Sequence, residues 1–329
     1  MSEEYAEPQR ISFRKIFLRL FLTVCALLVA GSTTLWYFNT PPDDFPIEKR
    51  VYIPAGSTLS QISAILKSHQ VIRSGLMFRG VILSYHKESS LHAGEYLFHQ
   101  KNSLLEVAQS FIADTALIPP VKVTIPEGST LEEIDRRLSS VLPAIQSGDI
   151  VKSAQGQEGI LFPDTYLLED SLTADQVVTK LRDTFAQKLV PFESDLAHDS
   201  LTKQEIIVLA SILEKEANDA NSMHMVSGIL RKRLEKHMPL QVDATFAYLL
   251  HKTSSELTPA DLAIDSPFNT YTHKGLPPTP IASPGSMAIE AALHPQDSSY
   301  FFYLTDKEGV FHYAVTFDEH KKNKARYLR

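Results

Sequence analysis

An uncharged and mostly apolar run of 19 residues, from Leu20 to Phe38, constrains this chain more than any other feature. An α-helix rises about 1.5 Å per residue, so such a run is long enough to cross a bilayer core of about 30 Å. Four basic residues precede the run, and Asp43 and Asp44 follow it. The positive-inside rule therefore predicts a cytoplasmic tail at 1–19, a single transmembrane helix at 20–38 and export of the remainder. A cleaved signal peptide is the alternative, but the run exceeds a usual h-region and no Ala-x-Ala motif follows it.

Charge and composition exclude several classes of function for the exported part. The formal net charge is -7 and the isoelectric point is near 5.9, which argues against a nucleic-acid partner. The single cysteine, Cys25, lies inside the apolar run, so disulfides, thiolate metal sites and cysteine nucleophiles are not expected. The histidines show no metal-binding spacing and no phosphate-binding glycine loop is present, so we expect neither a metal nor another cofactor.

A repeated segment marks the start of two folded regions after a short acidic, Pro-containing linker at 39–46. The stretch VYIPAGSTL at 51–59 returns as VTIPEGSTL at 123–131. Each copy reads as a short strand, a Pro-x-Gly turn and a Ser-Thr pair that caps an amphipathic helix. We therefore expect two related strand-turn-helix units.

The remaining pattern predicts an α+β protein. In the first region we expect helices near 76–85 and 104–112 and a strand at 94–98. This order resembles a small LysM-like α/β subdomain at 47–118, for which glycan binding and a purely structural spacer role are both open. In the second region, 119–329, helices are expected at 173–190, 201–217 and 222–236, with a hairpin formed by 300–304 and 311–315. A proline-rich, loop-rich segment at 267–284 is expected to line a groove.

Glu214 is the most informative single residue, because it lies in an otherwise apolar stretch, LASILEKEA at 209–217. Thr202 and Glu205 have the spacing of a capping box, so a buried helix should begin there. The wheel neighbours of Glu214 are mostly small, which leaves room for a pocket: Ile207, Ala210, Ser211 and Ala217. Desolvation in such a place keeps a carboxyl protonated near neutral pH, as a general acid requires. A solvated helix end is the alternative that this stretch alone leaves open.

Six motifs from 209 to 295 follow one another in a specific order: LASILEKE at 209–216, LQVDAT at 240–245, FNTY at 268–271, GLPP at 275–278, PIASPG at 280–285 and AALHP at 291–295. EGILFPDTY at 158–166 lies upstream of them. Together they resemble the MltG-type (YceG-like) endolytic murein transglycosylases, and the resemblance extends over nearly the whole chain. It implies cleavage of the β-1,4 bond between N-acetylmuramic acid and N-acetylglucosamine within nascent peptidoglycan strands, leaving 1,6-anhydro ends. It also implies an enzyme held at the inner membrane with a periplasmic or extracytoplasmic catalytic domain, near peptidoglycan synthases, that terminates strands or sets their length.

The resemblance places the catalytic acid at Glu214. In this reaction the muramoyl 6-hydroxyl is the nucleophile, so one carboxyl can act first as acid and then as base. Glu216 lies about 160° away around the helix and is expected to support the site rather than face the same sugar. Candidate substrate contacts are Glu158, Gln241, Asp243, Thr245, Asn269 and Tyr271, with Gln241, Asp243 and Thr245 expected to alternate along an extended segment. For each of these a structural role in capping, pinning or forming a turn is the alternative.

Two other functions remain open from the sequence. A membrane-anchored glycan-binding scaffold would have Glu214 tied up with no cavity above it. A two-carboxylate hydrolase would need a second acid within about 5 to 10 Å across the groove.

Overall fold

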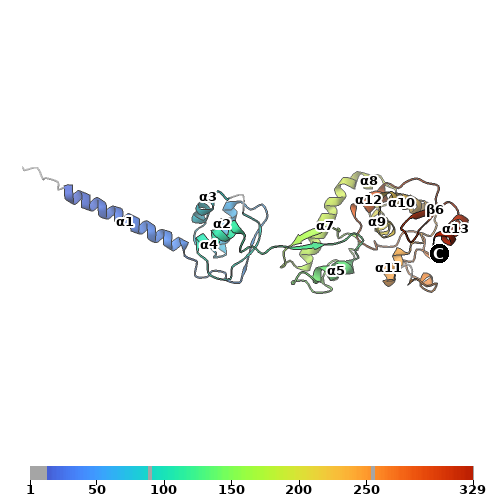
Figure 1. The fold of residues 1–329 in the computed structure, drawn as a ribbon, viewed down its shortest axis with the longest axis horizontal. Helices are drawn as coiled ribbons and strands as arrows, with labels where there is room; N and C mark the ends of the chain where they lie inside the picture. Colours follow the sequence, from blue (N-terminus) through green and yellow to red (C-terminus); the bar gives the residue numbers. More distant parts are fainter. Residues whose placement is uncertain (1–12, 88–90, 253–255, 329) are drawn as a thin grey trace, which may run out of the picture. The chain divides into compact units, whose positions relative to one another are not determined.

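Residues 13–87, 91–252 and 256–328 are described by a computed structural model and divide into two units, Met1–Pro120 and Val121–Arg329 (Figure 1). The N-terminal helix α1 spans Phe13–Asn39, and its segment Ile16–Asn39 is long and apolar enough to cross a membrane. Most of the predicted cytoplasmic tail, residues 1–12, lies outside the described residues. The orientation of the helix in a membrane therefore remains a prediction.

The first unit has the predicted strand-helix-helix-strand-helix order. Strand β1 (Arg50–Ile53) pairs antiparallel with β2 (Gly94–Leu97). Helices α2 (Leu59–Ser68), α3 (Gly75–Ser84) and α4 (Leu104–Ala113) contribute most of the remaining core residues. At its centre the Tyr96 ring stacks on Phe111 with 3.9 Å between centroids. Whether this unit binds glycan as a LysM-like subdomain remains a prediction.

The second unit opens with the repeated element. Strand β3 (Val121–Thr124) pairs antiparallel with β4 (Thr165–Leu168), and helices α5 (Leu131–Ser139), α6 (Asp149–Ser153) and α7 (Ala174–Leu189) pack with them around one core. The two copies fold alike, because Thr58 with Gln61 and Thr130 with Glu133 form equivalent capping boxes. The strand-turn-helix prediction is therefore confirmed in both regions.

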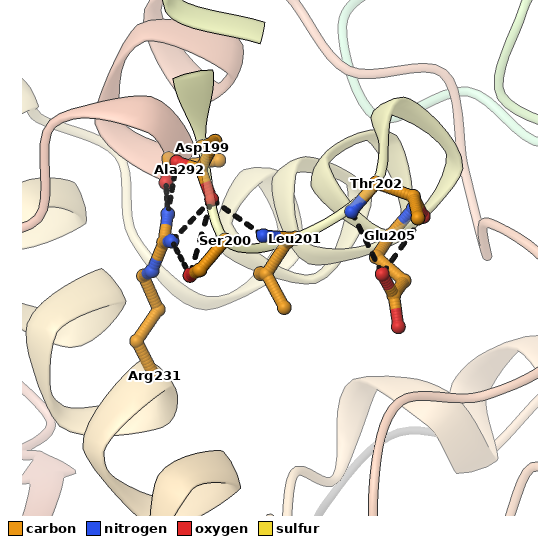
Figure 2. Close-up of polar contacts among 7 residues, drawn as sticks. All are labelled: Asp199, Ser200, Leu201, Thr202, Glu205, Arg231 and Ala292. Atoms are coloured by element: carbon orange, nitrogen blue, oxygen red, sulfur yellow. Dashed lines mark hydrogen bonds and ion pairs between the residues drawn. The ribbon is translucent and has the colours of Figure 1, made fainter. Parts of the chain in front are cut away.

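A second core lies around helix α9 (Lys203–Glu216), which packs between α10 (Ala220–Glu235) and α12 (Ser286–Leu293). Thr202 and Glu205 form the predicted capping box (Figure 2). Every residue from Ile206 to Leu213 is buried, so α9 is a core helix on all sides, as its apolar run predicts. The short segments η2 (Val190–Phe192) and α8 (Glu193–His198) lead into it.

A partly buried ion pair joins this helical core. The guanidinium of Arg231 on α10 forms a two-pronged contact with the Asp199 carboxylate, which precedes α9 (Figure 2). Arg231 also donates to the backbone oxygen of Ala292, at 2.8 Å, and to the Ser200 hydroxyl, at 3.1 Å. Burial alone would raise the pKa of Asp199, but the hydrogen bonds from Arg231 and from the Leu201 N–H bring it below its ordinary value.

The C-terminal part confirms the predicted hairpin and adds helices that the pattern does not indicate. Strands β5 (Phe302–Thr305) and β6 (Phe311–Ala314) pair antiparallel through a turn in which Gly309 has φ of 82°. Helix α13 (Phe317–Tyr327) follows, and α11 (Ala244–Leu250) and η4 (Asp261–Ala263) lie upstream.

The expectation of an extended segment through Gln241, Asp243 and Thr245 is wrong. Gln241 has a positive φ of 53° and turns the chain, and Asp243 is the N-cap of α11. Thr245 lies inside that helix, where its side chain is fully buried and its hydroxyl donates to the backbone oxygen of Val242. A two-residue alternation therefore cannot bring the three side chains to one face.

Candidate functional site

Glu214 lies in the last turn of α9, with its side chain half-buried. Its Oε2 atom accepts a 2.9 Å hydrogen bond from the backbone N–H of Gly285, the N-cap of α12. Burial raises the pKa of the Glu214 carboxyl above its ordinary value of 4.5. The Gly285 N–H and Lys215 oppose that rise, and the charge of Glu127 adds to it. The net effect favours the protonated acid.

The loop that carries Gly285 is fixed against the turn of the second repeat. The Gly128 N–H donates to the backbone oxygen of Ser283, and the Ser283 N–H donates to that of Ser129, both at 2.9 Å. Lys215 donates its ammonium to the Gly128 oxygen at 3.1 Å. A Cβ on Gly285 would overlap the carboxylate of Glu127, so a larger residue there would have to displace that side chain, while the φ at this position is ordinary. The turn, the loop and the end of α9 thus form one junction around Glu214.

A cavity of about 1050 Å³ opens beside the other acid of this helix end, Glu216. Its lining includes the candidate residues Glu216, Gln241, Asp243 and Tyr271, together with Lys215, Arg233, Ala244, Ala247, Phe302, Tyr303, Leu304, Thr305, Phe317, His320, Lys321, Lys324 and Leu328. Glu214 is not among the described residues that line it. The expected groove above Glu214 is therefore not confirmed, although four of the predicted site residues do share one cavity.

Hydrogen bonds hold the acids of this cavity in place. The Tyr303 hydroxyl donates to Glu216 Oε2 at 2.9 Å, and the Tyr271 hydroxyl donates to Asp243 Oδ1 at 2.5 Å. Burial raises the pKa of Glu216 to about 7, the Tyr303 hydrogen bond lowers it in part, and the charge of Asp243 raises it further. Arg233 lies nearby and donates to backbone oxygens of Phe301 and Leu240.

Glu158 lies in the loop between α6 and β4, and its carboxylate reaches the first residue of α5. It accepts a 2.9 Å hydrogen bond from the Leu131 N–H and a longer one, 3.4 Å, from the Tyr248 hydroxyl. Burial raises the pKa of Glu158 to about 7 despite these two hydrogen bonds. This is the geometry of the capping and pinning role that was the alternative to substrate contact.

Asn269 is fully buried and bonds only within its own loop among the described residues. Its amide nitrogen donates to the oxygens of Leu262 and Ile264, and its oxygen accepts the Tyr271 N–H. Asn269 and Thr245 therefore hold backbone rather than face the cavity. Within the described ranges no group of three or more His, Cys, Asp or Glu residues could hold a metal ion.

Three residues of the two neighbourhoods were not singled out from the sequence: Glu127, Arg233 and Tyr303. Glu127 did leave a signal, because it is the turn residue that distinguishes the second repeat from Ala55 in the first. The sequence gives no signal for Arg233 or Tyr303, because arginine is common in helices and tyrosine is common in strands.

Comparisons with known proteins agree with these motifs. The model of the YceG-like family matches residues 51–326. An endolytic murein transglycosylase of Bacillus subtilis (strain 168) is 29% identical over 316 residues, covering 86% of this chain and 87% of the relative. One from Streptococcus pneumoniae serotype 2 (strain D39 / NCTC 7466) is 27% identical over 361 residues, covering 95% of this chain but 65% of the longer relative. The crystal structure of a yceG-like protein from Listeria monocytogenes superposes with a TM-score of 0.59 at 29% identity, covering 83% of this chain and 98% of that one.

Proposed function

This chain belongs to the YceG-like family, and on that premise we propose that it is an endolytic lytic transglycosylase of peptidoglycan. Relatives that carry this name match most of its length. The substrate is the glycan strand, cut at the β-1,4 bond between N-acetylmuramic acid and N-acetylglucosamine. The observation that carries the proposal is Glu214, a half-buried acid fixed by the Gly285 N–H in the motif that the sequence singles out.

One carboxyl is sufficient for this reaction. The protonated Glu214 gives its proton to the glycosidic oxygen as the bond from that oxygen to C1 of the muramoyl residue breaks. The muramoyl 6-hydroxyl oxygen then bonds to C1, and its proton passes to the Glu214 carboxylate, which restores the starting acid. No water is consumed and nothing is oxidised or reduced. The raised pKa of Glu214 suits its first role, and the Gly285 N–H stabilises the carboxylate of its second.

Glu216 is the competing acid, because its pKa is near 7 and it faces the cavity. The Tyr303 hydroxyl donates to it, and the backbone of Ala244 also lowers its pKa. Such a carboxylate is committed to structure or to orienting substrate groups. We therefore assign proton transfer to Glu214. Because Glu214 does not line the cavity, we assign Gln241, Asp243 and Tyr271 to sugars of the strand away from the bond that is cut.

Placement at a membrane follows from α1. With residues Ile16–Asn39 as an anchor and basic residues preceding them, we propose a single-pass protein of the cytoplasmic membrane whose second unit is extracytoplasmic. There it would meet strands as synthases extend them, and its cuts would set strand length.

Product analysis tests the function. The full chain in detergent micelles is incubated with uncross-linked glycan strands, and the new ends are identified by mass spectrometry. Shorter strands ending in 1,6-anhydromuramic acid are expected. Intact strands under conditions where the protein is folded would contradict the proposal and favour a scaffold.

A hydrolase is the second candidate, because Glu127 and Glu214 flank the same glycine. Glycoside hydrolases usually use a pair of carboxyl groups. Reducing ends in place of anhydro ends would select this alternative.

A further inference from the structure

We propose that Glu127 is a positioning residue for catalysis: its carboxylate lies against Gly285, the same residue that hydrogen-bonds Glu214, and its charge adds to burial in favouring the acid form of Glu214. This inference rests on the proposed function. It assigns a role to a residue outside the motif block at 209–295. It also separates proton transfer by Glu214 from the effect of the charge beside Glu214, so each can be tested alone.

Gly285 lies next to both acids. The N–H of this residue donates to Glu214, while the space beside its α-carbon is filled by Oε1 of Glu127. Glu214 also approaches the turn of Glu127 directly, since a Cβ on Gly128 would lie 3.5 Å from Glu214 Cγ. The two carboxylates therefore belong to one neighbourhood, although 87 residues separate them in the chain.

The repeat shows that the turn does not need a glutamate. In the first copy Gly56 has φ of 74° and the Ser57 hydroxyl donates to the Pro54 oxygen at 2.7 Å. In the second copy Gly128 has φ of 72° and the Ser129 hydroxyl donates to the Pro126 oxygen at 2.6 Å. The turns are the same, yet the first carries Ala55 where the second carries Glu127. The glutamate is therefore not explained by local conformation.

Three groups act electrostatically on Glu214. The Gly285 N–H and the Lys215 ammonium favour its charged form, and Glu127 opposes it. Lys215 is in addition engaged with the Gly128 oxygen, which holds its charge at this junction. Glu127 is exposed, so its side chain approaches Gly285 from the solvent side. Without it, the two favourable contacts would let Glu214 ionise at lower pH and lose the proton that the leaving oxygen needs.

The test is a pH profile of anhydro-product formation by the full chain in micelles. Glu127→Gln keeps the size of the side chain and removes its charge. We expect the alkaline limb of kcat to move to lower pH by about half a unit to one unit, with KM nearly unchanged. At pH values on that limb, kcat should fall roughly three- to tenfold, since one pH unit is tenfold in ionisation. Glu127→Asp keeps the charge and should restore most of the wild-type limb.

Ala55→Glu is the matched control, because it places the same side chain in the same turn of the first unit. Its profile should equal that of the wild type. If Glu127→Gln is poorly folded by circular dichroism, Glu127→Ala replaces it, since alanine already stands in the equivalent turn. A direct titration of Glu214 by carboxyl ¹³C NMR adds a readout that does not require turnover.

The outcomes are distinct. The inference is supported if the alkaline limb of kcat and the NMR titration of Glu214 both move to lower pH in Glu127→Gln. Both should return toward the wild-type pH in Glu127→Asp. An unchanged limb and titration overturn it, even if Glu214→Gln is inactive. Full activity of Glu214→Gln would instead refute the assigned acid, and the NMR titration would still show whether Glu127 acts on it.

Discussion

Gly285 donates its backbone N–H to Glu214 Oε2 at 2.9 Å, across a separation of 71 residues in the sequence. A backbone donor cannot rotate away as a side chain can, so the direction of the carboxyl is set by the loop that carries Gly285. That loop is itself bonded to the turn at 126–130. The geometry of the acid is thus built from three segments, which gives specific consequences for substitutions.

Glu214→Gln should abolish formation of anhydro ends while the protein stays folded. The amide oxygen can still accept the Gly285 N–H, but the amide cannot give up or take a proton at the scissile bond. General acid-base groups contribute roughly 10²- to 10⁴-fold, so a loss of at least about 100-fold in kcat is expected. Chromatographic quantification of the anhydro product measures it.

Two further variants calibrate this loss. Glu235→Gln changes an exposed acid at the end of α10 and should leave turnover unchanged. Glu216→Gln should raise KM more than it lowers kcat if Glu216 orients substrate. A larger kcat loss in Glu216→Gln than in Glu214→Gln would move the proton-transfer role to the cavity.

Gly285→Ala should destabilise the second unit, because the new methyl group overlaps the Glu127 carboxylate. The backbone conformation at this position, φ -79° and ψ 174°, suits alanine, and the exposed Glu127 side chain can move aside, so the steric cost should stay below about 1 kcal/mol. Removing the obstacle should relieve it: in Glu127→Ala, the Gly285→Ala change should cost clearly less. Urea unfolding of the four proteins gives this double-mutant cycle, and additive losses would show that the two residues do not contact each other.

Arg231→Met should destabilise the helical core by roughly 1–3 kcal/mol, because it leaves the partly buried Asp199 carboxylate without its charged partner. Arg231→Lys should recover only part of the loss, since an ammonium cannot make the two-pronged contact. Arg182→Met, at an exposed position on α7, is the matched control. Urea midpoints at neutral pH measure all three, and equal midpoints for the two methionine variants would contradict the role given to Arg231.

Stability should fall as the pH rises from about 4.5 to about 7. Glu158 and Glu216 have ordinary pKa values of 4.5 and folded-state pKa values of about 7. In that window the folded protein holds protons that the unfolded chain releases, so each group lowers the free energy of unfolding by on the order of 1 kcal/mol per pH unit. Above pH 7 both states are ionised and this contribution is constant.

Calorimetric melting temperatures across this window check the prediction. Glu158→Gln should make the fall of the melting temperature with pH shallower by the contribution of one carboxyl group. Glu235→Gln should leave this slope unchanged. Parallel curves for the wild type and Glu158→Gln would show that Glu158 does not titrate in this range.

The sequence predicted those helices and strands whose signals lie within a few adjacent residues. The capping pair Thr202 and Glu205 and the apolar run after them define α9, and the repeated stretch defines two strand-turn-helix units. Helix α12 escaped prediction because its apolar residues directly follow Pro284 and Gly285, which favour a loop reading. Helix α11 escaped because Gln241, Asp243 and Thr245 also fit a two-residue alternation.

The site was predictable only in part. The rule that residues two apart on a helix face different ways correctly separates Glu214, bonded to Gly285, from Glu216, bonded to Tyr303. Which acid would lie beside the cavity depends on α13 and the C-terminal hairpin, whose approach to α9 is tertiary. Glu158 and Asn269 were candidates by motif, but Glu158 accepts the N–H of Leu131, 27 residues earlier, and Asn269 bonds to backbone within its own loop.

The bonds between the turn at 126–130 and the loop at 282–285 also govern when activity can arise. Synthesis proceeds from the N-terminus, so the residues of α9 are made before the loop exists. Until Gly285 has emerged and closed onto Gly128 and Ser129, the Glu214 carboxyl has neither its backbone donor nor the charge of Glu127 placed against that glycine. A chain that ends before this loop would therefore contain Glu214 without the Gly285 hydrogen bond and without Glu127 placed beside that glycine. The cutting activity would begin only after the loop has been made and has closed onto the turn.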